Sequence, residues 1–115
     1  MQGDGQVLME DTAEGDCLVV CLREERLDAV IAASFKDALL ERINQGQRHI
    51  VLDMAHVGFM DSSGLGAVVS ILKHLGTKGW LHLYGVTPGV MAVLKLTRMD
   101  RVFKTFDSRQ AALVP

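Results

Sequence analysis

Three short apolar runs, separated by stretches with helical periodicity, constrain the fold of this chain more than any other feature. The runs cover residues 17–22, 49–53 and 80–84. The first two are apolar on both alternating faces, which is typical of strands that are covered on both sides. Because such runs alternate here with helical stretches, the sequence predicts an α/β layer fold.

The stretches between the runs predict about four helices. These are expected over residues 30–44, from Ser62 or Ser63 to residue 78, from Pro88 onward, and after the capping pair Asp107-Ser108 through residue 112. Gly46 is suited to end the first helix. The expected apolar faces consist of Ile31, Phe35, Ala38, Leu39 and Ile43 in the first helix, and of Leu65, Val68, Val69, Leu72 and Leu75 in the second.

Two weaker strand signals complete the predicted sheet. Residues 7–10 are typical of a short edge strand, and so are residues 102–106. The whole pattern predicts a mixed, mostly buried sheet of four to five strands flanked by about four helices. One domain is expected to span residues 1–115, with residues 1–6 flexible.

Composition limits the classes of partner. The 115 residues are 49% apolar and 23% charged with a formal net charge of −2, which suits one compact soluble domain. No Lys/Arg cluster forms the basic stripe of a nucleic-acid binder, so no nucleic acid is expected as a partner. No apolar run approaches the roughly 20 residues that span a bilayer, and the N-terminus is unlike a signal peptide. We therefore expect a cytoplasmic protein with no membrane partner.

Cysteines and histidines do not form a predicted disulfide or metal site. Cys17 and Cys21 would lie about 13 Å apart along a strand, whereas a disulfide needs Cα atoms within about 7 Å. Buried free thiols are the expected state. The four histidines are scattered and form no tetrahedral set, so neither a metal nor a cofactor is expected. Met91 and Met99, with Leu94 and Leu96, either fill the core or form a small apolar contact patch.

The segment Asp61-Ser62-Ser63-Gly64-Leu65-Gly66 carries most of the functional information. It stands where a strand gives way to a helix. An Asp or Ser there can cap the helix, and the glycines leave room for another molecule to approach the backbone. Because free amides and the helix dipole favour negative charge at this end, the Ser62 hydroxyl is well placed to carry a phosphoryl group.

The same segment could also be a plain helix cap, whereas catalytic roles are disfavoured. A serine hydrolase would need Gly-x-Ser-x-Gly, but Met60 replaces the first glycine and no histidine motif supplies a base. Asp53 ends a buried strand, as in a response-regulator receiver, but no acidic pair follows the first strand to hold magnesium. Nothing around Ser62 resembles catalytic machinery, so the chain is not predicted to be an enzyme.

In this setting the motif resembles the STAS-domain family, in particular the bacterial anti-sigma factor antagonists. The resemblance covers almost the whole domain. Leu27-Asp28 is similar to the family's Gly-x-Leu-Asp element, residues 49–53 to its central strand and residues 93–103 to its C-terminal part. Glu25 stands where the family has the glycine of that element.

The resemblance implies a partner-switching regulator. It implies that Ser62 is phosphorylated by an anti-sigma factor that is also a serine kinase, and that a protein serine phosphatase reverses the modification. The unphosphorylated protein would bind the kinase and would be released on phosphorylation. The implied partner-binding residues are Asp28, Asp61, Ser62, Ser63, Gly64 and Leu65.

Some of these roles stay open at the level of sequence. Asp28 serves either as part of the partner surface or as the cap of the first helix. Ser63 has a structural alternative as a cap or in a backbone hydrogen bond. A non-switching STAS scaffold subunit of a transporter or sensory complex is the alternative function. A monomer or weak dimer is expected.

Overall fold

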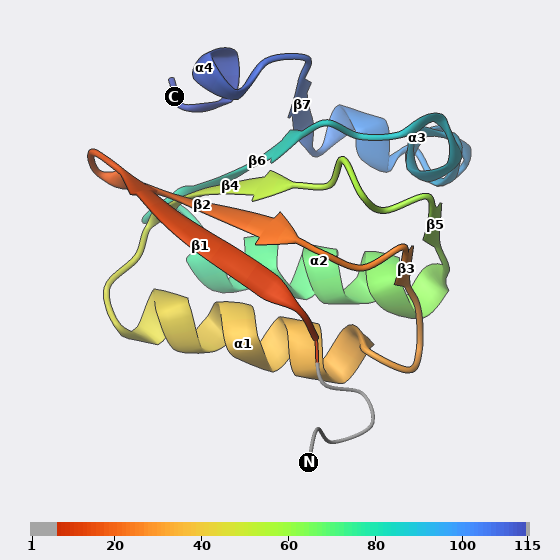
Figure 1. Cartoon of the computed structure of the whole chain (residues 1–115), viewed down its shortest axis with the longest axis horizontal. Coiled ribbons are helices and arrows are strands. Elements are labelled where there is room, and N and C mark those ends of the chain that lie inside the picture. Colours follow the sequence, from red (N-terminus) through yellow and green to blue (C-terminus); the bar gives the residue numbers. More distant parts are fainter. Residues whose placement is uncertain (1–6, 115) are drawn as a thin grey trace.

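The computed structural model describes residues 7–114, in which strands and helices alternate as the sequence predicts (Figure 1). The predicted flexibility of residues 1–6 falls outside the described residues. The strands are β1 (Met9–Glu14), β2 (Cys17–Leu22), β3 (Arg26–Leu27), β4 (His49–Asp53), β5 (Phe59–Met60), β6 (Trp80–Tyr84) and β7 (Lys104–Phe106). The helices are α1 (Ala32–Asn44), α2 (Ser62–Leu75), α3 (Pro88–Leu96) and α4 (Arg109–Ala112), and a 3₁₀ turn, η1, covers Met99–Arg101.

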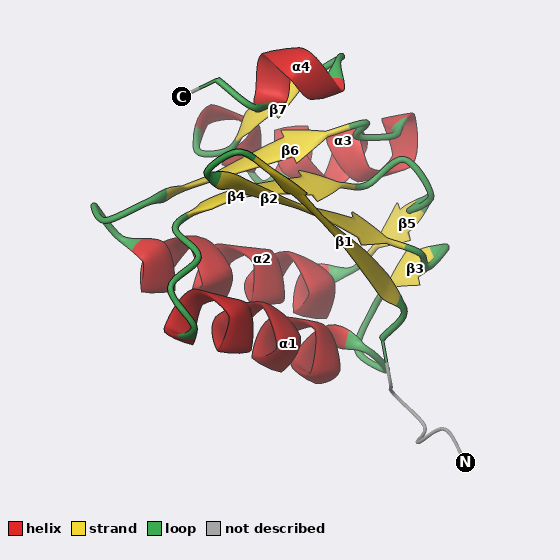
Figure 2. Ribbon diagram, turned by 60° about the vertical axis from the view of Figure 1, so that its left-hand side comes forward, coloured by secondary structure: helices red, strands yellow, loops and turns green. Residues whose placement is uncertain are grey.

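A mixed five-stranded sheet in the order β1-β2-β4-β6-β7 forms the centre of the domain. β1 runs antiparallel to β2, and the turn between them contains Gly15 with a φ of 60°, which glycine adopts without strain. β2, β4, β6 and β7 are parallel. Figures 1 and 2 show α1 and α2 against one face of the sheet and α4 on the other. The predicted α/β class and mixed sheet are confirmed.

Both faces of the central strands are covered, which explains why their sequences are apolar at consecutive positions. The main core includes alternate residues of these strands and the inward faces of the helices, among them Leu22, Phe35, Leu39, Ile50, Leu52, Ile71, Leu83 and Leu94. A smaller cluster on the opposite face contains Val19, Val51 and Ala112 of α4. His82 lies on this second face with only 2% of its surface exposed.

The helix boundaries differ from the predicted ones for local reasons. α1 begins at Ala32 and not at residue 30, because the Asp28 carbonyl accepts hydrogen bonds from the amides of Ile31 and Ala32 and holds a turn there. α2 ends at Leu75 and not at residue 78, because Gly76 leaves the helix with a φ of 56°. Among residues 7–114, no helix combines the length and the apolar character needed to cross a membrane.

The edge strands also differ from the prediction. β1 covers Met9–Glu14 and not residues 7–10, because it pairs with the whole of β2 up to the Gly15 turn. β7 begins at Lys104 and not at residue 102, because η1 precedes it and the amides of Val102 and Phe103 bond back to the Met99 carbonyl. The pair β3–β5 was not predicted, since two residues per strand are too few to show a periodicity.

The buried face of α2 is also not the predicted one. Val68 and Leu75 are buried as expected, but Leu65, Val69 and Leu72 are only half-buried, and Ala67 and Ile71 take their place. Apolar residues surround most of this helix, so spacing alone does not identify the stripe that faces the sheet. In α1 the predicted face is confirmed except for Ala38, which is half-buried.

The cysteines and the two C-terminal methionines are only partly buried. Cys17 and Cys21 are free thiols, as predicted, but they are half-buried and not buried. Burial raises the pKa of both thiols, and neighbouring carboxylates raise it further. Met91 and Met99 pack partly buried against the core and Leu94 is buried, whereas Leu96 is 87% exposed.

Candidate functional site

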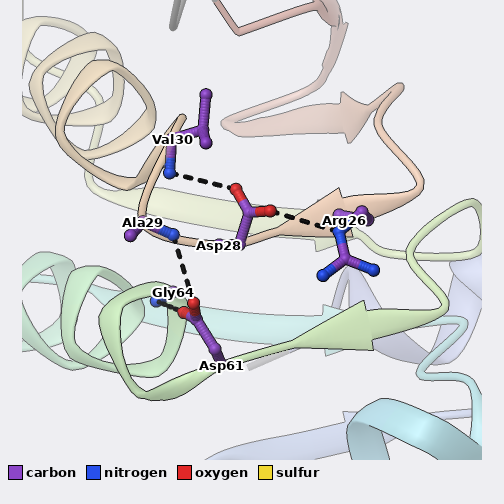
Figure 3. Close-up of polar contacts among 6 residues, drawn as sticks. All are labelled: Arg26, Asp28, Ala29, Val30, Asp61 and Gly64. Atoms are coloured by element: carbon purple, nitrogen blue, oxygen red, sulfur yellow. Dashed lines mark hydrogen bonds and ion pairs between the residues drawn. The ribbon is translucent and has the colours of Figure 1, made fainter.

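Asp61 is the N-cap of α2 and ties this helix to the loop that follows β3 (Figure 3). Its backbone is extended, as expected of a cap, and its Oδ1 accepts a hydrogen bond from the Gly64 amide at 2.9 Å. Its Oδ2 accepts a second one from the Ala29 amide at 3.2 Å. One carboxylate therefore fixes both the first turn of α2 and the neighbouring loop. The capping role predicted for this segment is confirmed at Asp61.

The short parallel pair β3–β5 brings the two predicted site segments together. Leu27 pairs with Met60, and the Asp61 amide donates to the Leu27 carbonyl at 3.3 Å. Asp28 and Asp61 each follow one of these strands. The Leu27-Asp28 element and the motif that begins at Asp61 therefore meet on one surface.

Asp28 closes the turn before α1 and does not cap that helix itself. Its Oδ1 accepts from the Val30 amide at 3.1 Å, and its Oδ2 accepts from Arg26 Nε at 3.2 Å (Figure 3). The N-cap position of α1 belongs to Ile31, which provides no side-chain cap. The Arg26 guanidinium also lies over the Phe59 ring, with Cζ 4.1 Å from the ring centroid. The carboxylate of Asp28 is thus engaged within the domain, with about a fifth of its side chain exposed (19%).

Ser62 and Ser63 occupy the first turn of α2 and are both exposed. Within residues 7–114, neither hydroxyl makes a hydrogen bond, so the structural alternative for Ser63 is not observed. Because Asp61 does the capping, the Ser62 hydroxyl is free at a helix N-terminus, where the dipole and the free amides favour an anion. This environment suits a phosphoryl group.

The two glycines of the motif play different roles, and the expectation that both leave room for another molecule is wrong for Gly64. A β-carbon at Gly64 would overlap the Leu27 carbonyl oxygen, so this glycine permits the close approach of α2 to β3 within the domain. Gly66 is exposed and has no heavy atom within 4 Å of where its β-carbon would stand. Leu65, between them, is half-buried.

Three adjoining hollows lie beside this surface, and no motif in the sequence predicts them. Their volumes are about 430, 470 and 460 Å³, and Glu25 lines all three. The first reaches Asp28 and Val30, and Val30 is 69% exposed. No sequence signal distinguishes an exposed valine from a buried one, because the difference depends on the turn that precedes α1.

The backbone at residue 25 does not require a glycine, although the Gly-x-Leu-Asp element of the family has one at this position. The φ of Glu25 is not positive, since Arg98 is the single non-glycine residue with positive φ in the part that the structure describes. Its carbonyl accepts hydrogen bonds from the amides of Gly58 and Phe59 at 2.9 and 3.2 Å, which fix the loop against β5. The loop shape is therefore compatible with a side chain at this position.

Within residues 7–114, no histidine makes a hydrogen bond to Ser62. The histidine rings that have polar or stacking contacts lie elsewhere: His49 and His82 flank Trp80 in a stack of rings, and His74 faces Asn44. No group of three or more His, Cys, Asp or Glu side chains in residues 7–114 is arranged to hold a metal ion. What this surface offers is an exposed hydroxyl on a fixed helix end beside a concave loop.

Comparison with known proteins identifies the family. The sequence profile of the STAS domain matches residues 9–112. The chain belongs to the STAS-domain family. A Thermotoga maritima protein, provisionally named an anti-sigma factor antagonist, is 31% identical over 100 residues, which cover 85% of this chain and 88% of that protein.

Solved structures of this family share the fold. The crystal structure of a Thermotoga maritima protein with the same provisional name has a TM-score of 0.81 and 31% identity, covering 90% of each chain. The Bacillus cell fate determinant SpoIIAA, solved in its phosphorylated form, has a TM-score of 0.68 at 21% identity over 91% of this chain and 95% of that one. At this level of identity, the similarity to SpoIIAA shows a shared fold and nothing more.

Proposed function

We propose that this STAS domain is an anti-sigma factor antagonist that changes partners when Ser62 is phosphorylated. The unphosphorylated protein binds an anti-sigma factor that is also a serine kinase, and thereby frees the sigma factor. Phosphorylation by this kinase releases the antagonist, and a protein serine phosphatase restores the binding form. The protein itself catalyses no reaction and acts in the cytoplasm.

The observation that carries this proposal is the exposure of Ser62 at the capped end of α2. A kinase must reach the hydroxyl, and Ser62 is exposed with no competing hydrogen bond among residues 7–114. The names of the relatives support the same role, since they assign an anti-sigma factor antagonist function to proteins of this family. The partner surface would include Asp28, Asp61, Ser63 and Leu65 around the phosphorylated serine, whereas Gly64, predicted from the sequence as a further contact, is buried and packs against β3 within the domain.

Electrostatics explains how one modification can change partner choice and leave the fold intact. Phosphorylation adds roughly −1.5 to −2 charges at Ser62. In the free domain, the N-terminal end of α2 and water accommodate this charge. In a complex, the new charge would be buried beside the Asp61 carboxylate. An uncompensated buried charge of this kind costs several kcal/mol, on the order of a thousandfold in affinity.

The proposal is tested by measuring the intact mass of the protein. The protein is first incubated with ATP and a purified serine kinase of the anti-sigma factor class that is encoded in the same genome. We expect an increment of about 80 Da for one phosphoryl group, lost in Ser62→Ala and kept in Ser63→Ala. Ser62→Ala should bind the kinase persistently in calorimetry, and Ser62→Asp should bind at least tenfold more weakly.

Two outcomes would contradict the proposal. If Ser62→Asp keeps the full affinity of the unmodified protein, charge at this position does not control binding. If stable binding occurs with no mass increment, the domain is a fixed scaffold subunit in which Ser62 is not modified.

A further inference from the structure

A second surface lies at the far end of α3, away from Ser62. α3 begins beside β5, where the Thr87 hydroxyl donates to the Val57 carbonyl at 2.6 Å, and it ends at Leu96. Nine helical residues place these ends about 13 Å apart along the axis. Four amide hydrogen bonds to carbonyls three or four residues earlier then fold the chain into a tight corner; the donors are Arg98, Arg101, Val102 and Phe103. We call residues 95–104 the C-terminal corner.

The C-terminal corner is basic although the chain as a whole is acidic. Lys95, Arg98, Arg101 and Lys104 are all exposed, and Asp100 is the one acidic residue of the segment. None of the four cations forms an ion pair with a residue in the described range 7–114. The whole chain has 12 basic and 14 acidic residues, so eight basic and thirteen acidic residues remain outside the corner. Four unpaired cations in ten residues favour an acidic partner.

Exposed apolar side chains accompany these charges. Leu96 is 87% exposed and Val102 is 50% exposed, which makes them two of the six large apolar residues that residues 7–114 leave exposed. Neither side chain fills the core, since Val90 and Leu94 form the buried face of α3 and Phe103 is the buried neighbour of Val102. A surface that carries both exposed aliphatic groups and cations suits a peptide better than a polyanion alone.

A hollow of about 280 Å³ borders the corner at the open edge of β6. It is lined by Leu72, Gly79, Trp80, Leu81, His82, Val102 and Lys104. The hollow forms because the ladder between β6 and β7 starts at His82 and Lys104, so Trp80 and Leu81 have no strand partner on that side. Its walls are mainly apolar, and Lys104 adds a cation. The volume is sufficient for one large apolar side chain, whereas small-molecule pockets commonly measure about 300–1,000 Å³.

We infer that the C-terminal corner and this hollow form a second docking surface, and that its occupant is an acidic segment of a partner protein carrying one large apolar side chain. The apolar side chain enters the hollow between Trp80 and Val102. Carboxylates on either side of it pair with Arg98, Arg101 and Lys104. This surface is distinct from the Ser62 surface, and the inference does not depend on phosphorylation.

The same features argue against the other occupants of a basic surface. A membrane-binding helix needs a continuous apolar face, but α3 turns Val90 and Leu94 into the core. A nucleic-acid backbone would pair with the cations but would leave Leu96 and Val102 without apolar contact. A peptide with acidic and apolar side chains would pair with the cations and also cover Leu96 and Val102.

The inference is tested by selecting binders of the immobilised full chain from a random peptide library. The library peptides have about ten residues, which span roughly 33 Å when extended. Enriched peptides should combine at least two acidic residues with one large apolar residue. A synthetic copy of such a peptide should change the fluorescence of Trp80, which is the single tryptophan of the chain. Backbone amide shifts in NMR should map to residues 79–82 and 95–104, and not to residues 61–65.

Charge reversal gives the matched comparison. Arg98→Glu combined with Arg101→Glu should weaken the peptide at least tenfold, and Leu96→Ser should weaken it while leaving the fold intact. Lys36→Glu, on α1, should bind the peptide as the unmodified chain does. Far-UV circular dichroism checks that each variant folds.

Three results would overturn the inference. The first is that the selected peptides lack acidic residues. The second is that the Arg98→Glu, Arg101→Glu double variant binds the peptide as well as Lys36→Glu does. The third is that no peptide is enriched and phosphatidylglycerol vesicles bind the chain through the same residues.

Discussion

Gly64 in α2 lies so close to the Leu27 carbonyl oxygen in β3 that a β-carbon on Gly64 would overlap that oxygen. The oxygen belongs to the backbone, so no change of rotamer relieves the overlap. The two elements that carry the candidate site are therefore held together by the absence of one side chain.

Gly64→Ala should destabilise the domain by about 2 kcal/mol, because overpacking costs roughly 1–3 kcal/mol and outweighs the gain of up to about 1 kcal/mol in helix propensity. Gly66→Ala is the matched control, since the space around that position is open. It should stabilise the domain by up to about 1 kcal/mol. Urea unfolding of both variants measures the contrast, and equal effects would show that the close approach is not needed.

The Asp61 carboxylate accepts hydrogen bonds from two amides, and each can be followed separately. Asp61→Ala should lower the free energy of unfolding by about 2 kcal/mol, combining the loss of a cap with the loss of the bond from Ala29. Asp61→Asn should lose less, because its single amide oxygen still accepts one bond. Hydrogen exchange at Gly64 and Ala29 should accelerate in Asp61→Ala. Unchanged protection of both amides would contradict the role assigned to this side chain.

Local signals in the sequence predict much of the fold and the centre of the site. The consecutive apolar residues of β2 and β4 reflect burial on both sheet faces, and the Asp61 cap follows from a motif within one turn of helix. These features depend on neighbours along the chain or on a burial pattern. Their prediction therefore needs no knowledge of tertiary contacts.

The features that the sequence does not predict depend on distant contacts. The β3–β5 pair involves two residues on each side, and it decides that Asp28 lies beside Asp61. The close approach of Gly64 to Leu27 and the hollows around Glu25 lie beside this pair, where segments distant in the sequence meet. The buried stripe of α2 likewise depends on how the helix rests against both the sheet and α1.

Glu25 and Arg98 give opposite expectations for substitution by glycine. Glu25 has no positive φ, so Glu25→Gly should lose about 0.5–1 kcal/mol through greater freedom of the unfolded chain. Arg98 has a φ of 62°, where a side chain costs roughly 1–2 kcal/mol, so Arg98→Gly should stabilise the domain by up to about 1 kcal/mol. Thermal unfolding of the two variants tests this. A gain in Glu25→Gly would mean that the loop is strained at that position.

His82 couples the C-terminal helix to the second face of the sheet. Its Nδ1 donates to the Ala112 carbonyl at 2.8 Å, and its ring stacks on Trp80 with 3.9 Å between centroids. Burial lowers the pKa of His82, which outweighs the opposing effect of the bond to Ala112; Lys104 and His49 lower it further. The folded state therefore holds this ring neutral.

The free energy of unfolding should fall as the pH drops below about 6.5, the pKa of histidine in an unfolded chain. Below that pH the unfolded chain binds a proton at His82 that the folded domain does not, so acid favours unfolding. The contribution of His82 is fully present above about pH 6.5 and is lost as the pH falls toward its lowered folded-state pKa. Chemical unfolding between about pH 7.5 and 5 should show a smaller slope in His82→Gln than in the unmodified chain. His74→Gln, which removes an exposed histidine of α2, should keep the original slope; if both variants lose it equally, the buried ring is not its source.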